Sequence, residues 1–428
     1  MRTSPRGLAR IGAIAALVLA ATACSEDTSD VGSAVGTAST AAASSTATAP
    51  PALGGAVDPA QLDALVEQAM DASSLRAVMV RVTVDGEPAY EVARGESMSG
   101  VPATTGMHFR YGAFGFTVVA TLLMVLVDEG EVSLDDPLSN WYPDLPRAGD
   151  ITLQNLANMT SGYADYVYQP EVLEGTTFEP FRQWTPEELI DIGVASMDFE
   201  PGTNWGYSHT NYVILGQVLE QVTGMELSEA LRARVLEPIG ATGTTNPTTP
   251  AIPDPVLHSF SSERRGLLQI PADVPFYEDA TFWNPSWTTH EGAVGVSTIS
   301  DLTTIMEAVG TGELLSEESF EEQTAPNLIG FGQTDPNCAA CRENNVGFNY
   351  ALGAINVGPW FTQSKNFAGS DAAAGYLAER QLAVAVVANY GEEAFDDEGN
   401  YTEASASAAQ SVFRQVVDVV APDTLPSP

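Results

Sequence analysis

The sequence has very little positive charge. Its 428 residues include 17 lysines and arginines against 56 aspartates and glutamates, a net charge of −39. Removing residues 1–23, which hold three arginines, leaves 14 − 56 = −42. Such a surface repels phosphate backbones, which argues against a nucleic-acid partner, and it favours solubility outside the cell. Lysine is the scarcest residue type, and Lys365 is the only lysine in the chain.

The apolar run near the start of the chain is too short to span a bilayer. Residues 11–20 follow three arginines, a pattern typical of an export signal. The next residues, Ala21-Thr22-Ala23-Cys24, resemble a lipobox, although Ala21 stands where that pattern prefers leucine. The sequence therefore predicts a signal peptide over residues 1–23 and a lipidated Cys24, with a plain secretory signal as the alternative. An acyl chain would anchor the protein to the outer face of the cell membrane, an extracytoplasmic location in the cell envelope.

Cysteine is scarce too, with three in the chain. Two of them, Cys338 and Cys341, lie in the segment Asn337-Cys-Ala-Ala-Cys341. In an exported chain we interpret this pair as a small disulfide loop. A redox site of the thioredoxin type would need a βαβ context, and zinc would need two further ligands nearby, which the flanking residues do not provide.

Composition divides the chain into a linker, a folded domain and a tail. Residues 24–57 are rich in serine, threonine, alanine and glycine without apolar periodicity, which predicts a linker. Residues 421–428 contain three prolines and predict a flexible tail. The folded domain is therefore expected over residues 58–420.

Apolar periodicity within that domain alternates between the helical and the strand type. It predicts helices over 59–70, 116–129 and 404–420, and strands over 77–84, 89–93, 350–357 and 381–388. Asp85-Gly86 is a turn signal that joins the first two strands into a hairpin. Because strands occur at both ends of the domain, we expect the two ends to share one antiparallel sheet around a helical lobe, in a single α/β (α+β) domain.

Several segments resemble one known family and occur in its order. Residues 109–117 (FRYGAFGFT) and 126–137 (LVDEGEVSLDDP) resemble the nucleophile helix of serine β-lactamases, D-alanyl-D-alanine carboxypeptidases of the penicillin-binding-protein type and related esterases. Later landmarks of the family match residues 151–162, 201–212, 292–298 and 367–376. The resemblance covers about three quarters of the chain. It implies an antiparallel sheet flanked by helices with a helical lobe, the serine β-lactamase-like fold.

The family's first catalytic motif, Ser-x-x-Lys, is missing. Its spacing places a hydroxyl and an amine on one face of a helix, so that the amine accepts the proton as the oxygen attacks a carbonyl. The matching positions here are Ala113 and Phe116, which have neither group. No Ser-x-x-Lys occurs elsewhere, because the residue three before Lys365 is Thr362.

The other two motifs are altered as well. Tyr-x-Asn corresponds to Tyr207-Ser208-His209, which keeps the phenol and loses the amide. Lys/His-x-Gly corresponds to Gly369-Ser370-Asp371, which loses the positive charge and gains a carboxylate. The resemblance implies that Asp371 would repel the carboxylate of β-lactam and D-Ala-D-Ala ligands.

We therefore expect no catalysis at the six family positions and regard Tyr207, His209, Ser370 and Asp371 as candidate ligand-binding residues. A substitute triad of Ser370, His209 and Asp371 is the alternative. Strand alternation counts against it, because residue 370 points away from the face shared by 369 and 371.

We expect structural rather than catalytic roles for most of the remaining candidate residues. Phe114 and Phe116 either fill the space of a lost polar site or make the floor of the pocket apolar. His209 is expected to be a neutral, hydrogen-bonded histidine, and Arg264-Arg265 a solvated pair. We expect no metal site, because the spacing of His108, His258 and His290 does not suit one, and no cofactor.

Three classes of function remain open. The first is a non-catalytic envelope lipoprotein, a pseudoenzyme that binds a peptidoglycan-like, lipid or protein ligand in the old cleft. The second is an active serine hydrolase of the esterase, carboxypeptidase or β-lactamase type that uses substitute residues. The third is a structural interaction protein in which the cleft has closed.

Overall fold

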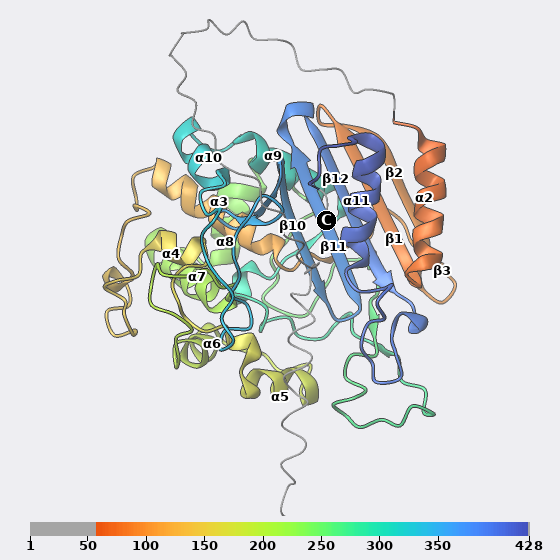
Figure 1. Cartoon of the computed structure of the whole chain (residues 1–428), viewed down its shortest axis with the longest axis horizontal. Coiled ribbons are helices and arrows are strands. Elements are labelled where there is room, and N and C mark those ends of the chain that lie inside the picture. The colour runs from red at the N-terminus through yellow and green to blue at the C-terminus, as the bar shows by residue number, and fades with distance from the viewer. Residues whose placement is uncertain (1–56, 427–428) are drawn as a thin grey trace, which may run out of the picture.

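The computed structural model describes residues 57–426, so the expected signal peptide, Cys24 and most of the linker lie outside the described residues. Among residues 57–426, no helix combines the length and the apolar character that crossing a bilayer requires. Figure 1 shows a central sheet with helices against both of its faces.

The central sheet has eight strands in the order β3-β2-β1-β12-β11-β10-β9-β8, and each neighbouring pair is antiparallel. The strands are β1 (Leu75–Val84), β2 (Glu87–Met98), β3 (Val101–Pro102), β8 (Asn349–Tyr350), β9 (Ile355–Val357), β10 (Trp360–Phe367), β11 (Ser370–Leu377) and β12 (Leu382–Tyr390). Strand β1 from the start of the domain pairs with β12 near its end, with Val80 opposite Val386. The predicted fold class, with both chain ends in one antiparallel sheet, is confirmed.

Two helices cover one face of this sheet. Helix α2 (Pro59–Ala72) begins after Asp58, whose carboxylate accepts a hydrogen bond from the backbone N–H of Ala60. Helix α11 (Ala408–Val420) buries Val412, Phe413 and Val416 beneath it. Because β12 is also covered on its other face, every residue from Leu382 to Tyr390 is buried, and the strand reads as a continuous apolar run.

The opposite face carries the helical lobe. Helices α3 (Phe114–Asp128) and α9 (Ile299–Thr311) pack nearest to the sheet (Figure 1). The other helices of this lobe are α4 (Leu153–Ala157), α5 (Pro170–Phe178), α6 (Pro186–Gly193), α7 (His209–Thr223), α8 (Leu227–Leu231) and α10 (Glu317–Thr324). Two small two-stranded sheets, β4 (Phe109–Arg110) with β7 (Val296–Ser297) and β5 (Phe260–Ser261) with β6 (Glu278–Asp279), lie beside the main sheet.

Some element boundaries differ from those predicted. The expected strand 350–357 is divided into β8 and β9, because a turn that contains Gly353 at φ 77° interrupts it. The closing helix begins at Ala408 rather than 404, because Ser407 adopts a left-handed backbone conformation with φ 55°. The hairpin of β10 and β11 was not predicted as a unit, although it holds the residues of the altered third motif.

Candidate functional site

The first turn of α3 holds the two positions of the missing Ser-x-x-Lys motif. Ala113 is the N-cap residue of α3, and its side chain makes no capping hydrogen bond. Phe116 is 1% exposed, and its ring stacks on Tyr212 with the centroids 4.2 Å apart. The same ring lies 5.8 Å from that of Tyr207 and 5.7 Å from that of His209. The lysine position of the family is thus occupied by an aromatic ring packed among three other rings.

The Tyr-x-Asn counterpart lies where α7 begins. Burial raises the pKa of the Tyr207 phenol well above its usual value, and the charge of Asp165 adds to this shift. A phenol with a raised pKa stays protonated at neutral pH, so Tyr207 can donate a hydrogen bond but is a poor proton acceptor. This arrangement does not suit Tyr207 as a general base.

Asp165 holds His209 in place, a role that the sequence did not reveal. Its Oδ2 lies 3.0 Å from Nδ1 of His209, and Oδ1 accepts a hydrogen bond from the His209 backbone N–H. The Asp165 side chain is 2% exposed. No local pattern distinguishes Asp165 from the other 55 acidic residues, so only the packing of its loop against α7 identifies it.

The third motif lies at the turn between β10 and β11. Gly369 has φ 72°, and a Cβ on it would lie 1.8 Å from the backbone oxygen of Phe260. A lysine or histidine therefore cannot occupy this position without moving the neighbouring strand β5. This close approach of two backbones, together with the positive φ, suits glycine at position 369.

Asp371 does not face the α3 side of the sheet, which corrects the expectation that it would repel ligands there. Its Oδ2 accepts hydrogen bonds from the Tyr390 hydroxyl at 3.0 Å and from the backbone N–H of Ala409 on α11 at 2.8 Å. Because side chains alternate along a strand, Asp371 lies on the α11 face of β11 and Ser370 on the α3 face. The expectation that residues 370 and 371 face opposite ways agrees with this structure.

Ser370 forms a hydrogen bond with the only lysine of the chain. The Nζ of Lys365 lies 2.6 Å from Oγ of Ser370, and the two residues are 6% and 8% exposed. The stem of Lys365 packs against Gly112, where a Cβ would lie only 2.8 Å from that of Lys365. The stem of Lys365 therefore lies beside Gly112, the residue before the N-cap of α3, while its amine is bonded to Ser370.

The surroundings of Lys365 lower the pKa of its amine. Burial lowers the pKa of its amine to about 7, and the nearby charge of Arg110 adds to the lowering, whereas Asp371 and Glu263 oppose it. Burial also raises the pKa of Asp371 to about 6. Near neutral pH, both protonation states of Lys365 are therefore populated.

The proposed triad of Ser370, His209 and Asp371 does not assemble. Ser370 is bonded to Lys365, His209 to Asp165, and Asp371 to groups on the far face of the sheet. Each of the three side chains thus has a different partner, which removes the geometric basis of that alternative.

The other candidate residues have structural partners. Arg264 makes two hydrogen bonds to the Glu278 carboxylate, so it is not a purely solvated residue, and Arg265 donates to the backbone oxygen of Pro271. Cys338 and Cys341 form a disulfide. Within the described range 57–426, no group of three histidine, cysteine or acidic residues is arranged to hold a metal ion.

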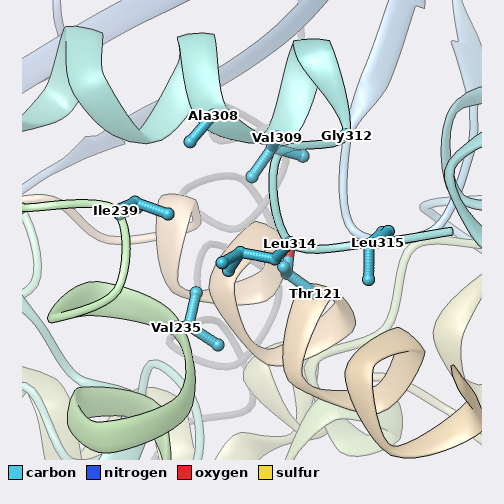
Figure 2. A pocket seen from close by; sticks show the side chains of 8 residues that line it. All are labelled: Thr121, Val235, Ile239, Ala308, Val309, Gly312, Leu314 and Leu315. Carbon is cyan, nitrogen blue, oxygen red and sulfur yellow. The ribbon is translucent and has the colours of Figure 1, made fainter. Parts of the chain in front are cut away.

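A small apolar pocket lies away from these residues, deeper along α3. Figure 2 shows the side chains of Val235, Ile239, Val309 and Leu314 around it, with Thr121 of α3 at one edge. Eight residues separate Thr121 from Ala113, a rise of about 12 Å along the helix. The pocket offers no titratable side chain, so it cannot itself carry acyl-transfer chemistry.

The eight-stranded antiparallel sheet and its helical lobe define a protein of the serine β-lactamase and penicillin-binding-protein class. The family model described as Beta-lactamase matches residues 62–408, so the chain belongs to this family, and the resemblance seen in its motifs is confirmed.

Relatives of the chain include an esterase and penicillin-binding proteins. It is 30% identical to esterase EstB of Burkholderia gladioli over 42% of its own length and 50% of the esterase. It is 33% identical to penicillin-binding protein 4 of Amycolatopsis lactamdurans over 37% of its length and 42% of that protein. The chain thus spans half or less of these curated relatives.

Solved structures show the same fold over more of the chain. A D-stereospecific amidohydrolase from Streptomyces sp. has a TM-score of 0.68 at 24% identity, covering 85% of this chain and 98% of that one. A penicillin-binding protein homologue from Pyrococcus abyssi has a TM-score of 0.66 at 20% identity, covering 86% and 79%. At these identities the likeness shows the fold alone.

Proposed function

We propose that this chain is an exported, membrane-anchored envelope protein that binds a ligand in the family cleft without the family's hydrolytic mechanism. The observation that carries this proposal is the aromatic cluster around Phe116, which lies where a catalytic lysine would stand. Ala113 offers no oxygen for attack on a carbonyl. Removal of an interdependent nucleophile and base leaves only the rate enhancement that binding supplies.

The nature of the ligand follows from the surroundings of α3. Phe116 is 1% exposed and packs against Tyr207, so of these two rings only the partly buried Tyr207, whose hydroxyl is a donor, can contact a ligand. Such a surface suits an apolar or acylated ligand held by a few polar contacts, such as a lipid or a peptidoglycan-like fragment. The export pattern and the acidic surface support a location outside the cytoplasm.

A penicillin probe and a thermal-shift measurement test this function. We expect no acyl adduct by intact-mass spectrometry when the native chain is treated with a fluorescent penicillin. We also expect the melting temperature to rise with muropeptide or phospholipid micelles, because a ligand that binds the folded state stabilises it. A penicillin adduct on the native chain, or no rise with either ligand, would overturn the proposal.

A double variant, Ala113→Ser with Phe116→Lys, provides the comparison for the labelling. It restores the missing hydroxyl and amine at the family spacing. The matched control is Ala113→Ser with Phe116→Leu, which restores the hydroxyl without a base.

One observation favours the second candidate, an active hydrolase that uses substitute residues. It is the hydrogen bond between Lys365 and Ser370, which places an amine against a hydroxyl. Similarity to an esterase is in keeping with this candidate, since such enzymes transfer acyl groups.

A further inference from the structure

We propose that Lys365 and Ser370 form a base–nucleophile pair that transfers acyl groups from uncharged esters. The pair uses neither position of the missing Ser-x-x-Lys motif, and it goes beyond the ligand binding proposed above. A nucleophilic hydroxyl needs a proton acceptor within hydrogen-bond distance, and the 2.6 Å contact from Nζ to Oγ supplies one.

The β10–β11 hairpin holds the two side chains together. Phe367 pairs with Ser370 and Lys365 pairs with Ala372, so Lys365 and Ser370 lie diagonally across the two strands on the same face. Lys365 is further restrained because its stem lies against Gly112. Residues on paired strands hold a more constant geometry than residues on loops, which suits a catalytic pair.

The protonation state of Lys365 fits a general base. Its amine has a pKa of about 7, chiefly because burial disfavours the charged form. An uncharged fraction is therefore present at neutral pH, whereas an exposed lysine has almost none. The charged groups that act on Lys365 are Arg110 from β4, Asp371 from β11 and Glu263 from the loop after β5.

The chemical step balances without a cofactor. The neutral Nζ of Lys365 accepts the hydroxyl proton as Oγ of Ser370 attacks the ester carbonyl and a new C–O bond forms. The bond to the leaving alcohol then breaks, and the proton passes from Nζ to the alkoxide. The amine is again neutral, so it can remove a proton from water as the water oxygen attacks the acyl carbonyl. The acyl–Oγ bond then breaks, the carboxylic acid leaves, and Nζ returns the proton to Oγ of Ser370.

The local charges favour uncharged substrates. When Lys365 is neutral, the positive charge of Arg110 is opposed by Glu263, and Asp371 lies on the α11 face, so no net positive charge remains beside Ser370 to bind an anionic ligand. The nearby rings are apolar, because Phe367 lies 5.2 Å from Nζ and 6.0 Å from Trp287. An ester with a short apolar acyl chain fits both features better than a carboxylate-bearing β-lactam.

Labelling with a fluorophosphonate tests the nucleophile. We expect the native protein to gain one adduct, mapped by peptide mass spectrometry to Ser370. We expect the labelling rate to fall at least 100-fold in Ser370→Ala and in Lys365→Met, a loss typical of a missing nucleophile or general base. Ser364→Ala is the matched control, because Ser364 lies on β10 but bonds to Gln410, and its labelling should stay at the native rate.

A pH profile separates a base from a structural partner. Hydrolysis of p-nitrophenyl butyrate by the native chain should rise with pH through about 7 and then level off, as the Lys365 amine becomes neutral. Lys365→Arg keeps the charge but cannot lose its proton, so its activity should be lost at every pH while its melting temperature stays measurable.

The outcomes for this pair and for ligand binding are distinguishable. A folded native protein that shows neither fluorophosphonate labelling nor ester turnover overturns the Lys365–Ser370 pair, and so does labelling at another residue. A rise of melting temperature with muropeptide or phospholipid would in that case still support binding. Labelling of Ser370 without any such rise would support the pair and overturn the proposed binding.

Discussion

Phe116 stacks on Tyr212 with the ring centroids 4.2 Å apart and the planes inclined by 20°. This contact joins the first turn of α3 to α7, whose first residue is His209. A catalytic lysine at position 116 would need polar partners, whereas here the position contributes to the hydrophobic core. The benzyl group of Phe116 therefore packs the two helices together and supplies no proton acceptor.

We therefore expect Phe116→Ala to destabilise the protein. Truncation of a buried phenylalanine typically costs about 3–5 kcal/mol, because apolar contacts are lost and a cavity remains. Urea unfolding followed by circular dichroism measures this change. The control is Phe181→Ala, whose side chain is 68% exposed and should change stability by about 0.5 kcal/mol or less. Equal effects of the two substitutions would contradict the packing role of Phe116.

Stability should depend on pH through Lys365. Its pKa is about 7 in the folded protein and about 10.4 in an unfolded chain, so between these values the unfolded state binds more protons. Stability is therefore expected to rise with pH from 7 to 9, below the range in which tyrosines titrate. Unfolding free energies measured at these two pH values should differ in the native chain and much less in Lys365→Met. An equal rise in both proteins would show that Lys365 is not the cause.

The disulfide should contribute modestly to stability. Cys338 and Cys341 close a very short loop, for which the chain-entropy model gives about 2 kcal/mol. The bridge packs against Gly206, since a Cβ there would lie 3.0 Å from Sγ of Cys341. We expect Cys338→Ser with Cys341→Ser to lower the free energy of unfolding by about this amount, measured against the native chain without reductant. A loss of folding altogether would assign the bridge a larger role.

The proposed lipid anchor is tested at Cys24. In a bacterial host, the native chain should partition into the membrane fraction and carry the added mass of a diacylglyceryl group. Cys24→Ser should shift the protein to the soluble extracytoplasmic fraction, because an acyl chain is the proposed means of attachment. Membrane retention of Cys24→Ser would contradict the anchor, and Cys338→Ser serves as the matched cysteine control.

Local sequence patterns were sufficient to predict several elements of the fold. The turn signal Asp85-Gly86 lies between β1 and β2 as expected. The apolar run over residues 381–388 predicted a strand, and the structure shows that β12 is buried on both faces. These features depend on residues close together in the chain, and their backbone preferences do not depend on distant contacts.

The sequence by itself also determined the chemistry at positions 113 and 116, because a methyl group and a benzyl group offer neither a hydroxyl nor an amine in any fold. Tertiary structure alone decided which groups meet. The register of β10 and β11 brought Lys365 to Ser370 and turned Asp371 toward α11, and loop packing brought Asp165 to His209. The physical reason is that register and long-range packing depend on the whole core, whereas the chemistry of a side chain is a property of the residue itself.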